Sequence, residues 1–399
     1  MPSSRGVPST WYRRYQAAWR TTSRATDSAP TATPNSLLRI VRILTVIGNR
    51  PQFVKAAGVS RLLRRRHEEV LVHTGQHYDD ELSQVFFDEL GVPAPDRHLK
   101  AGGGTNTGQT ARILGLLEEV IEQSAHDLLL VYCDTNSTLA GALAGAQAGV
   151  PIGHVEAGMR SFDRAMPEEL NRVLVDHASA LLLCSTDTAV ANLHRESVAG
   201  EVHLVGDVMA DVSLAFRPVA EQRSTVLSDL GLERGRYVLA TAHRPGNVDD
   251  PECLARLVEL LEALPLTTVL PLHPRTAARL DGAGLRDRLE AAARLRLTPP
   301  LGYLDFLALA AGARAILPDS GGVQKEAYLL GVPCVTLREN TEWTETVEVG
   351  WNTLVGLDRD AALRALGQPV PVGERPELYG GGHAAERVCA AIDAYTAPG

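Results

Sequence analysis

The chain has 399 residues, 45% hydrophobic and 22% charged, which is the composition of a soluble globular protein of two or three domains. The net charge is −9 and no basic patch occurs outside the first 40 residues and Arg64–Arg66, which argues against nucleic-acid binding. No apolar run approaches the roughly 18 residues that a membrane span needs. The five cysteines lack Cys-x-x-Cys spacing, so we expect no zinc site and a reducing, cytoplasmic location.

Residues 1–36 differ from the rest of the chain. They are rich in Ser, Thr, Pro, Ala and Arg and have no sustained hydrophobic periodicity. The pair Arg13-Arg14 is not followed by the apolar segment of an export signal. The segment is therefore predicted to be a disordered N-terminal extension.

From residue 37 onward, short apolar runs alternate with segments of helical periodicity. Such runs predict buried parallel strands whose two faces are covered by helices. The predicted strands are 39–47, 70–74, 128–133, 152–156, 181–185, 203–205, 237–242, 268–272, 295–297, 315–318 and 334–337. The predicted helices include 52–66, 110–123, 139–148, 251–264, 303–311 and 323–330.

The two series of strands, joined around 206–231, predict two Rossmann-like α/β domains that face one another across a cleft. The first covers 37–207 and the second 208–379. In open α/β sheets a ligand lies beyond the carboxyl ends of the strands, so the residues that follow each strand are the candidates for function.

Two segments of the first domain place charged residues at such ends. Arg50 and Lys55 begin the helix after the first strand, at a turn made by Gly48. Asp134 and Ser137 follow the strand 128–133, and either cap the next helix or, for Asp134, take part in catalysis.

Two further carboxylates come from the next two elements. Glu156 ends the strand 152–156, and Pro167 begins a helix on which Glu168 and Arg172 share a face at the i, i+4 spacing of a surface ion pair. Together with Asp134 they give three carboxylates on successive elements, which suits proton transfer at a carbon or a glycosidic oxygen.

The second domain carries a pattern typical of nucleotide binding. Asp319-Ser320-Gly321-Gly322 runs from a strand into a helix, so that the helix N-terminus and the Ser320 hydroxyl can meet phosphate. Glu326, farther along, can accept hydrogen bonds from ribose hydroxyls. His243 directly follows the first strand of this domain and is either structural or part of the cleft. By contrast, Gly103–Thr110 has Gln109 where a phosphate-binding P-loop has lysine, which argues against an NTPase and favours an ordinary glycine-rich loop.

These segments together resemble the non-hydrolysing UDP-N-acetylglucosamine (UDP-GlcNAc) 2-epimerases, in order and over about nine-tenths of the chain. The family pattern reads GTRPE-x-x-K, TGQH, HGDT-x-S, VEAGLRS, MPEE-x-NR, DH, VGN-x-x-x-D, TAHR-x-EN, HP, DSGG-x-QEE and TEW. The matching segments are 48–55, 74–77, 132–137, 155–161, 166–172, 176–177, 205–211, 241–247, 273–274, 319–326 and 341–343.

The resemblance implies a GT-B-like fold whose C-terminal helix, about 380–397, returns to the first domain. It also implies a cytoplasmic homodimer that interconverts UDP-GlcNAc and UDP-ManNAc without a cofactor or metal, by eliminating UDP to 2-acetamidoglucal and adding it back. A second UDP-GlcNAc would act as activator.

The resemblance also assigns roles to residues. Those implied in catalysis are Asp134, Glu156, Glu168 and His243. Those implied in substrate binding are Arg50, Lys55, Arg172, His273, Phe306, Ser320, Gly321, Gly322 and Glu326. Those implied in the activator site are Gln76, His77 and Gln109.

The chain departs from the family pattern without losing any residue assigned to chemistry. Near the activator site, Tyr78 and Asp79 differ from the usual Arg and Gln. Elsewhere the departures include Asn49 for Thr, Gln52 for Glu, Tyr132-Cys133 for His-Gly, Asp207 for Asn and Lys325 for Glu.

Three alternative functions remain open at this point. A hydrolysing 2-epimerase would use the same carboxylates and release free ManNAc and UDP. A GT-B glycosyltransferase would bind UDP but has no use for three carboxylates in the cleft. A non-enzymatic sensor of nucleotide sugars would not need the proposed catalytic groups.

Overall fold

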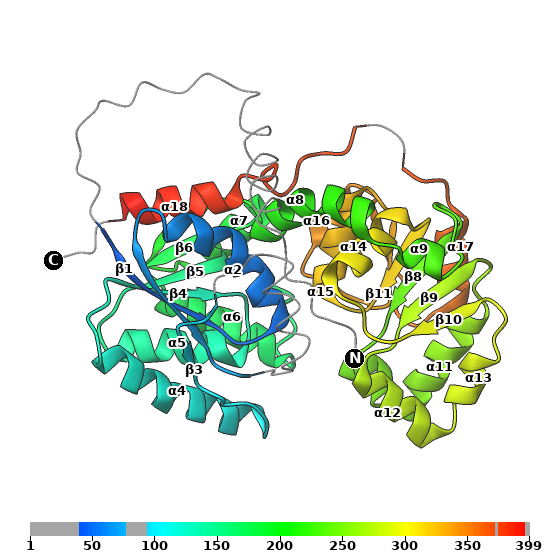
Figure 1. Cartoon of the computed structure of the whole chain (residues 1–399), viewed down its shortest axis with the longest axis horizontal. Helices are drawn as coiled ribbons and strands as arrows, with labels where there is room; N and C mark the ends of the chain where they lie inside the picture. The colour runs from blue at the N-terminus through cyan, green and yellow to red at the C-terminus, as the bar shows by residue number, and fades with distance from the viewer. Residues whose placement is uncertain (1–39, 77–93, 372–373, 396–399) are drawn as a thin grey trace.

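The computed structural model describes residues 40–76, 94–371 and 374–395. The predicted extension, 1–36, lies outside the described residues, as do His77, Tyr78 and Asp79. The described chain forms two α/β lobes, each built on one sheet (Figure 1).

The first lobe has a sheet of seven parallel strands in the order β3-β2-β1-β4-β5-β6-β7. The strands are β1 (Arg42–Ile47), β2 (Glu68–His73), β3 (Arg97–His98), β4 (Leu128–Tyr132), β5 (Ile152–Ala157), β6 (Leu181–Cys184) and β7 (Glu201–Leu204). The helices between them are α2 (Arg50–Leu63), α4 (Asn106–Glu122), α5 (Asn136–Gln147), α6 (Pro167–Ala178) and α7 (Asp187–Glu196).

The second lobe has a sheet of six parallel strands in the order β10-β9-β8-β11-β12-β13. The strands are β8 (Tyr237–Thr241), β9 (Thr267–Pro271), β10 (Leu295–Thr298), β11 (Ala315–Pro318), β12 (Cys334–Thr336) and β13 (Asn352–Leu354). The helices are α8 (Val208–Arg223), α9 (Val226–Asp229), α10 (Pro245–Val248), α11 (Pro251–Glu262), α12 (Pro274–Ala283), α13 (Arg286–Glu290), α14 (Tyr303–Gly312), α15 (Gly321–Leu330), α16 (Thr344–Glu348) and α17 (Arg359–Gly367).

The predicted fold class, two parallel-sheet α/β domains, is confirmed. Alternation along β1 shows why helices cover both faces: Ile43 and Ile47 join one hydrophobic cluster, and Leu44 and Val46 join another on the opposite face. Every strand predicted from an apolar run is present, with ends that differ by a few residues. No apolar run marks β3 or β13: both residues of β3 are exposed, and the buried residue of β13 is the polar Asn352.

Four predicted helices start too late in the sequence, among them α15, which begins at Gly321, two residues before its predicted start. The helices α2, α4 and α5 begin at Arg50, Asn106 and Asn136, two to four residues before their predicted starts. Each is capped by a polar side chain, which hydrophobic periodicity does not detect. The caps are Asn49, Thr105 and Thr135.

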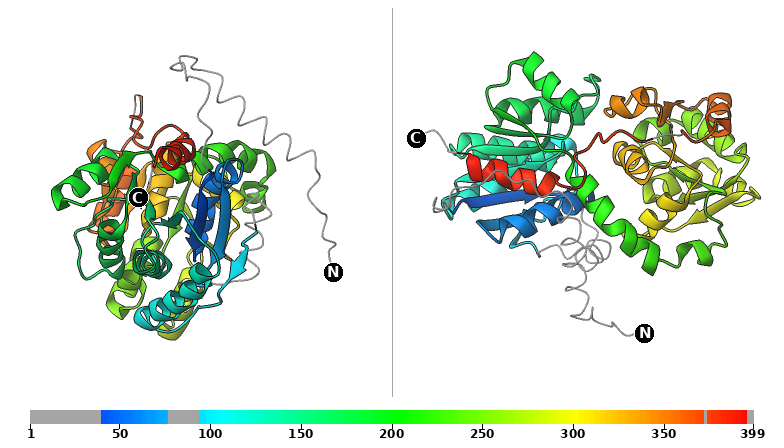
Figure 2. Two further views of the ribbon diagram at one scale, coloured as in Figure 1. Left: turned by 90° about the vertical axis from the view of Figure 1, so that its left-hand side faces the viewer. Right: turned by 90° about the horizontal axis from the view of Figure 1, so that it is seen from above.

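The helix α18 (Ala384–Ala394) lies beside α2 on the first lobe, after the chain has left the second lobe (Figures 1 and 2). Its residues Val388 and Ile392 are buried in the cluster that contains Leu63. The carboxylate of Asp211, in α8, accepts hydrogen bonds from the first two backbone N–H groups of α18 at 3.0 and 2.7 Å. The last segment of the chain thus ties the two lobes together.

Candidate functional site

The site begins with a close approach between the loops after β1 and β4. A Cβ at Gly48 would lie 2.0 Å from Ser137 Oγ, so only glycine fits this turn. Gln52 is fully buried and accepts a hydrogen bond from Gly48 N while donating to Tyr132 O at 2.6 Å. The amide at the position where the family pattern has Glu therefore joins the two loops.

The carboxyl ends of β4 and β5 hold two residues in left-handed backbone conformations. Cys133 has φ +57° and Glu156 has φ +72°, a region that favours glycine and costs other residues about 1–3 kcal/mol. The β5–β6 register shifts between Val155 and Ala157, so Glu156 occupies a bulge. Such strain at adjacent strand ends is typical of functional sites.

Asp134 is not a helix cap. The cap of α5 is Thr135, whose hydroxyl forms a capping box with Thr138. The Asp134 carboxylate instead accepts two hydrogen bonds from Arg172, at 2.9 Å from Nε and 2.6 Å from Nη2, both on Oδ2. Asn171 also binds the Asp134 carbonyl at 2.8 Å. The structure thus rules out the capping interpretation of Asp134.

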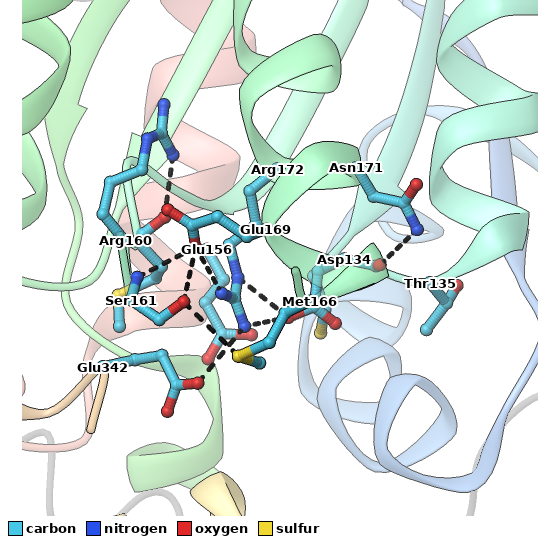
Figure 3. A network of polar contacts seen from close by, with 12 residues as sticks. Asp134, Thr135, Glu156, Arg160, Ser161, Met166, Glu169, Asn171, Arg172 and Glu342 are labelled. Carbon is cyan, nitrogen blue, oxygen red and sulfur yellow. Dashed lines mark hydrogen bonds and ion pairs between the residues drawn. The ribbon is translucent and has the colours of Figure 1, made fainter. Parts of the chain in front are cut away.

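Arg172 lies among three carboxylates (Figure 3). Besides Asp134, it donates to Glu169 at 2.8 Å and lies 3.8 Å from Glu342 of the second lobe. Burial opposes the charged form, but the carboxylates of Asp134, Glu342 and Glu169 outweigh it and raise the pKa of Arg172. This cation fixes Asp134 and contacts the other lobe.

The partner of Arg172 on α6 is Glu169, which the sequence analysis did not single out. Glu169 is buried and also accepts hydrogen bonds from Ser161 N and Phe162 N at 2.8 and 3.0 Å. These bonds and Arg172 overcome burial and lower the pKa of Glu169. The i, i+3 spacing from Glu169 to Arg172 was the available signal.

Glu168 is exposed in the first turn of α6 and does not form the pair with Arg172 that a shared face suggested. Its charge helps to raise the pKa of Arg244 in the second lobe, although burial and Arg338 lower that pKa more. Arg244 Nη2 also lies 3.2 Å from Met166 Sδ. Glu168 therefore lies at the edge where the lobes meet.

Glu156 is enclosed by cations. Lys55 Nζ contacts its Oε2 and also lies 2.9 Å from Cys133 Sγ. Lys325 Nζ, from α15 of the second lobe, lies 3.0 Å from Oε1. Burial alone would raise the pKa of Glu156, but Lys325 and Lys55 outweigh burial and hold that pKa well below its usual range. Glu156 is thus an ionised carboxylate.

The N-terminus of α15 forms the second half of the site. Asp319, which is fully buried, accepts hydrogen bonds from His243 N and Arg244 N at 2.5 and 2.7 Å. Ser320 Oγ is buried and has no hydrogen-bond partner within the described residues. Unpaired N–H groups and a buried hydroxyl at one helix end suit an anionic ligand.

His243 lies beside this helix end. Its Nδ1 is 3.2 Å from Asp319 Oδ1, and its ring stacks on His273 with centroids 5.2 Å apart. Burial lowers the pKa of His243, but the hydrogen bond and charge of Asp319 overcome it, so that the pKa is raised. A cation is therefore favoured next to the α15 terminus.

A protein-family model described as UDP-N-acetylglucosamine 2-epimerase matches residues 61–393. The chain belongs to the UDP-N-acetylglucosamine 2-epimerase family. This finding confirms the resemblance and identifies the chain as an enzyme, an epimerase of this family.

Relatives of the epimerase agree over most of its length. A UDP-N-acetylglucosamine 2-epimerase homolog of Methanococcus maripaludis is 46% identical over 335 residues, 84% of this chain and 94% of its own. A UDP-2,3-diacetamido-2,3-dideoxy-D-glucuronate 2-epimerase of Pseudomonas aeruginosa is 45% identical over 360 residues, 87% and 98%. A UDP-N-acetylglucosamine 2-epimerase of Methanocaldococcus jannaschii is 40% identical over 334 residues, 82% and 91%.

Solved structures support the GT-B-like arrangement of the epimerase. The M. jannaschii UDP-GlcNAc 2-epimerase in complex with UDP-GlcNAc and UDP superposes with a TM-score of 0.82 at 38% identity, covering 88% of this chain and 99% of the other. The Neisseria meningitidis UDP-GlcNAc 2-epimerase bound to UDP-GlcNAc gives 0.78 at 26% identity, covering 88% and 99%.

The other predicted binding residues of the epimerase are spread over both lobes. Arg50 is the first residue of α2. His273 caps α12 and accepts a hydrogen bond from Arg275 N at 3.1 Å. Phe306 is partly buried in α14, and Glu326 is buried in α15.

Gln76 and Gln109 of the epimerase have internal partners. Gln76 Oε1 accepts hydrogen bonds from Ser137 N and Oγ at 2.8 and 2.6 Å. Gln109 donates to Gln76 O at 3.1 Å and accepts from Asn136 at 2.8 Å. These amides join the loop after β2 to the starts of α4 and α5. Their hydrogen bonds have a structural role and do not by themselves support a binding site for a second nucleotide sugar.

Neither a metal cluster nor a membrane span is found in the described part of the epimerase. Among residues 40–76, 94–371 and 374–395, no group of three or more His, Cys, Asp or Glu side chains is arranged to hold a metal ion. None of the helices formed by these residues is long and apolar enough to cross a membrane.

Proposed function

We propose that this epimerase interconverts UDP-GlcNAc and UDP-ManNAc without hydrolysing either sugar nucleotide. The observation that carries the proposal is the contact between the α15 end and the first-lobe carboxylates. Lys325 of α15 contacts Glu156, and Glu342, which lies 3.4 Å from the place of a Cβ on Gly321, approaches Arg172. These contacts support a phosphate site on the second lobe that meets Glu156 and Arg172 of the first lobe across one boundary.

The diphosphate of UDP is assigned to the α15 terminus. The N–H groups after Gly321 and Gly322 and the Ser320 hydroxyl donate to its oxygens, and the helix dipole adds attraction. Arg50 supplies positive charge, and so does His243 at a pH below its raised pKa. Glu326 is assigned to the ribose and Phe306 to the uracil, with His273 stacked behind His243.

UDP binding should weaken as the pH rises through the raised pKa of His243, because the imidazolium loses the charge that attracts phosphate. Asp319→Asn removes the carboxylate that raises the pKa of His243. The variant should therefore lose affinity for UDP at a lower pH than the wild type does. Calorimetry of UDP binding between about pH 6 and pH 9 checks this shift.

His243→Gln is the matched control, because the ionisation of UDP itself is common to all three proteins. In His243→Gln, the loss of UDP affinity that accompanies deprotonation of His243 should be absent. Identical pH curves for all three would remove His243 from the phosphate site.

The proton chemistry is assigned to two carboxylates. C2 of the sugar is weakly acidic, so its C–H bond breaks as UDP leaves C1 with the C1–O electron pair, which gives the C1=C2 bond of the glycal. Asp134 is suited to this task because Arg172 occupies its Oδ2 while 26% of its side chain is exposed. Glu168, at the lobe edge, is assigned to the other face of C2.

Glu156 is not assigned to proton donation. The ammonium groups of Lys55 and Lys325 keep it ionised, so it serves as a fixed negative charge near the developing positive charge at C1. This narrows the role that the resemblance gives to this carboxylate.

The proposal predicts incorporation of solvent hydrogen. The proton returned to C2 comes from a carboxyl group that exchanges with water, so UDP-ManNAc formed in D₂O should gain one deuterium at C2. Mass spectrometry of the product, with product formed in H₂O as control, measures the one-dalton gain. Product that retains the original hydrogen would exclude the elimination mechanism.

The products of the same incubation distinguish the non-hydrolysing reaction from the hydrolysing one. A non-hydrolysing enzyme gives UDP-ManNAc, with only traces of glycal and UDP. Stoichiometric free ManNAc and UDP would instead assign the hydrolysing reaction, which uses the same first step.

A second candidate substrate has a specific observation in its favour. The P. aeruginosa relative named for UDP-2,3-diacetamido-2,3-dideoxy-D-glucuronate is 45% identical to this chain, about as similar as the M. maripaludis UDP-N-acetylglucosamine 2-epimerase homolog at 46%. Such a sugar carries a carboxylate, and Arg244 has no carboxylate within salt-bridge distance among the described residues. Comparing kcat/KM for the two sugar nucleotides decides between them.

The proposal extends to a cytoplasmic homodimer that uses no cofactor and is activated by a second UDP-GlcNAc. Light scattering measures the oligomeric state. A sigmoidal rate curve with UDP-GlcNAc would support activation, and a hyperbolic curve would agree with the internal bonds of Gln76 and Gln109.

A further inference from the structure

Lysine is rare in this chain. Its 39 basic Lys and Arg residues include only three lysines, Lys55, Lys100 and Lys325, and two of these three contact the same carboxylate, Glu156. An ammonium group is compact and binds as a point charge, whereas a guanidinium is a larger planar fork. A compact ammonium group suits two cations that share one buried carboxylate.

Lys325 is one of the cations that cross between the lobes, as Arg172 also does. Its side chain is 1% exposed, and its Nζ lies 3.0 Å from Glu156 Oε1, contacts Asp207 Oδ2 and lies 4.2 Å from the Trp343 ring centroid. Glu156 lies in β5 and Asp207 precedes α8 as its cap. The buried ion cluster therefore joins α15 to two separate elements.

Other titratable groups surround this cluster on both lobes. Lys55 and the Cys133 thiol face Glu156 from the first lobe, and Asp134 follows Cys133. Glu345 lies on the second-lobe side, where the charge of Lys325 lowers its pKa although burial raises it more. Removing Lys325 thus leaves several carboxylates with Lys55 as the remaining cation in contact with Glu156.

Two departures from the family pattern meet in this cluster. The pattern has Glu at position 325 and Asn at position 207, whereas this chain has Lys325 and Asp207 in contact with each other. A buried lysine keeps its charge where carboxylates are its partners. The acidic residue at 207 compensates for the basic residue at 325.

Lys325 also lies on the helix that is assigned to phosphate. Gly321 begins α15, and Lys325 is four residues farther along, about one helical turn. Because α15 is a rigid element, a shift of its N-terminus moves Nζ relative to Glu156. The helix end and the β5 carboxylate are mechanically coupled through one side chain.

We propose that Lys325, supported by Asp207, is a positioning residue that aligns the Glu156 carboxylate with the α15 terminus across the lobe boundary. This inference rests on the proposed function of the site. Lys325 touches neither the sugar nor the phosphate in this role; it fixes the place and charge of a carboxylate that does.

Lys325→Met, which keeps the length and apolar contacts of the side chain, should lower kcat by about a hundredfold, as expected when a catalytic group is misplaced by about 1 Å. KM should change by less than about threefold, because the phosphate contacts remain. Arg288→Met, which removes an exposed ion pair with Glu262 in the second lobe, is the matched control and should retain wild-type kcat.

The pH profile distinguishes positioning from a merely structural role. Without Lys325 the pKa of Glu156 rises, since burial remains while an opposing positive charge is lost. The acidic limb of the kcat/KM profile should then move to higher pH in Lys325→Met. In Asp207→Asn, Lys325 still contacts Glu156, so that limb should not move upward. Equal losses of kcat in both variants with unchanged profiles would overturn the proposal.

A second variant tests the same prediction in case Lys325→Met does not fold. Lys325→Met leaves Asp207 buried without its cation, whereas Lys325→Met combined with Asp207→Asn removes both charges. This double variant should fold and still show the upward shift of the acidic limb; an unshifted limb would overturn the proposal.

A readout that does not require turnover separates the two proposals. In urea unfolding, the effects of Lys325→Met and Glu156→Gln should be less than additive, because each removes one side of the same contact. Additive effects would overturn the inference, even with an active enzyme. Absence of any epimerisation by the wild type, with non-additive unfolding, would overturn the proposed function and leave the contact intact.

Discussion

Asp134→Asn should reduce turnover by about 10²–10⁴-fold, the usual contribution of a general acid–base group. The change keeps the shape of the side chain and one oxygen for Arg172, but it removes the carboxylate that would take the C2 proton. UDP affinity should stay within about threefold of the wild type, since the diphosphate is assigned to α15. Single-turnover rates and UDP calorimetry measure the two effects separately.

The matched control for Asp134→Asn is Asp281→Asn, the same change at an exposed aspartate paired with Arg286 at 3.3 Å on the second lobe. It should leave turnover unchanged. If Asp134→Asn kept more than about a third of wild-type turnover, Asp134 would have no acid–base role.

Arg172→Met should lower the free energy of unfolding by about 3–5 kcal/mol, the usual cost of removing one partner from a buried charge cluster. Arg172 is 7% exposed and donates to Asp134 and Glu169, so its loss leaves two carboxylates without their cation. Turnover should fall as well, because Asp134 loses the group that fixes it. Urea unfolding followed by circular dichroism measures the stability effect.

Arg288→Met is again the matched control, because its ion pair with Glu262 is exposed and worth about 1 kcal/mol or less. If Arg172→Met lost as little stability as Arg288→Met, Arg172 would not be the cation that stabilises the three carboxylates. UDP calorimetry on the same variant tests the phosphate contact implied for Arg172: a loss of about tenfold to a hundredfold is expected if one of its remaining N–H groups binds phosphate.

The sequence by itself determined the fold class and the edge at which the site lies. Continuous apolar runs such as 128–133 and 315–318 can only be buried parallel strands in this alternating pattern. Once the strands are known, Asp134 and Asp319 must follow their carboxyl ends, where ligands bind in open α/β sheets. Helix starts were less well predicted, because caps such as Thr135 act through one local hydrogen bond.

Only the tertiary structure decided which charged groups are partners. The i, i+4 spacing predicted an ion pair between Glu168 and Arg172. In the structure Glu169 is instead buried against Arg172, and Glu168 lies at the lobe edge. Glu156 and Lys325 are 169 residues apart, and no local pattern links them. Such pairs form because the return of the chain through α18 and the packing of α8 and α15 fix the lobes relative to one another, and a buried charge is stable only where that packing supplies its counter-charge.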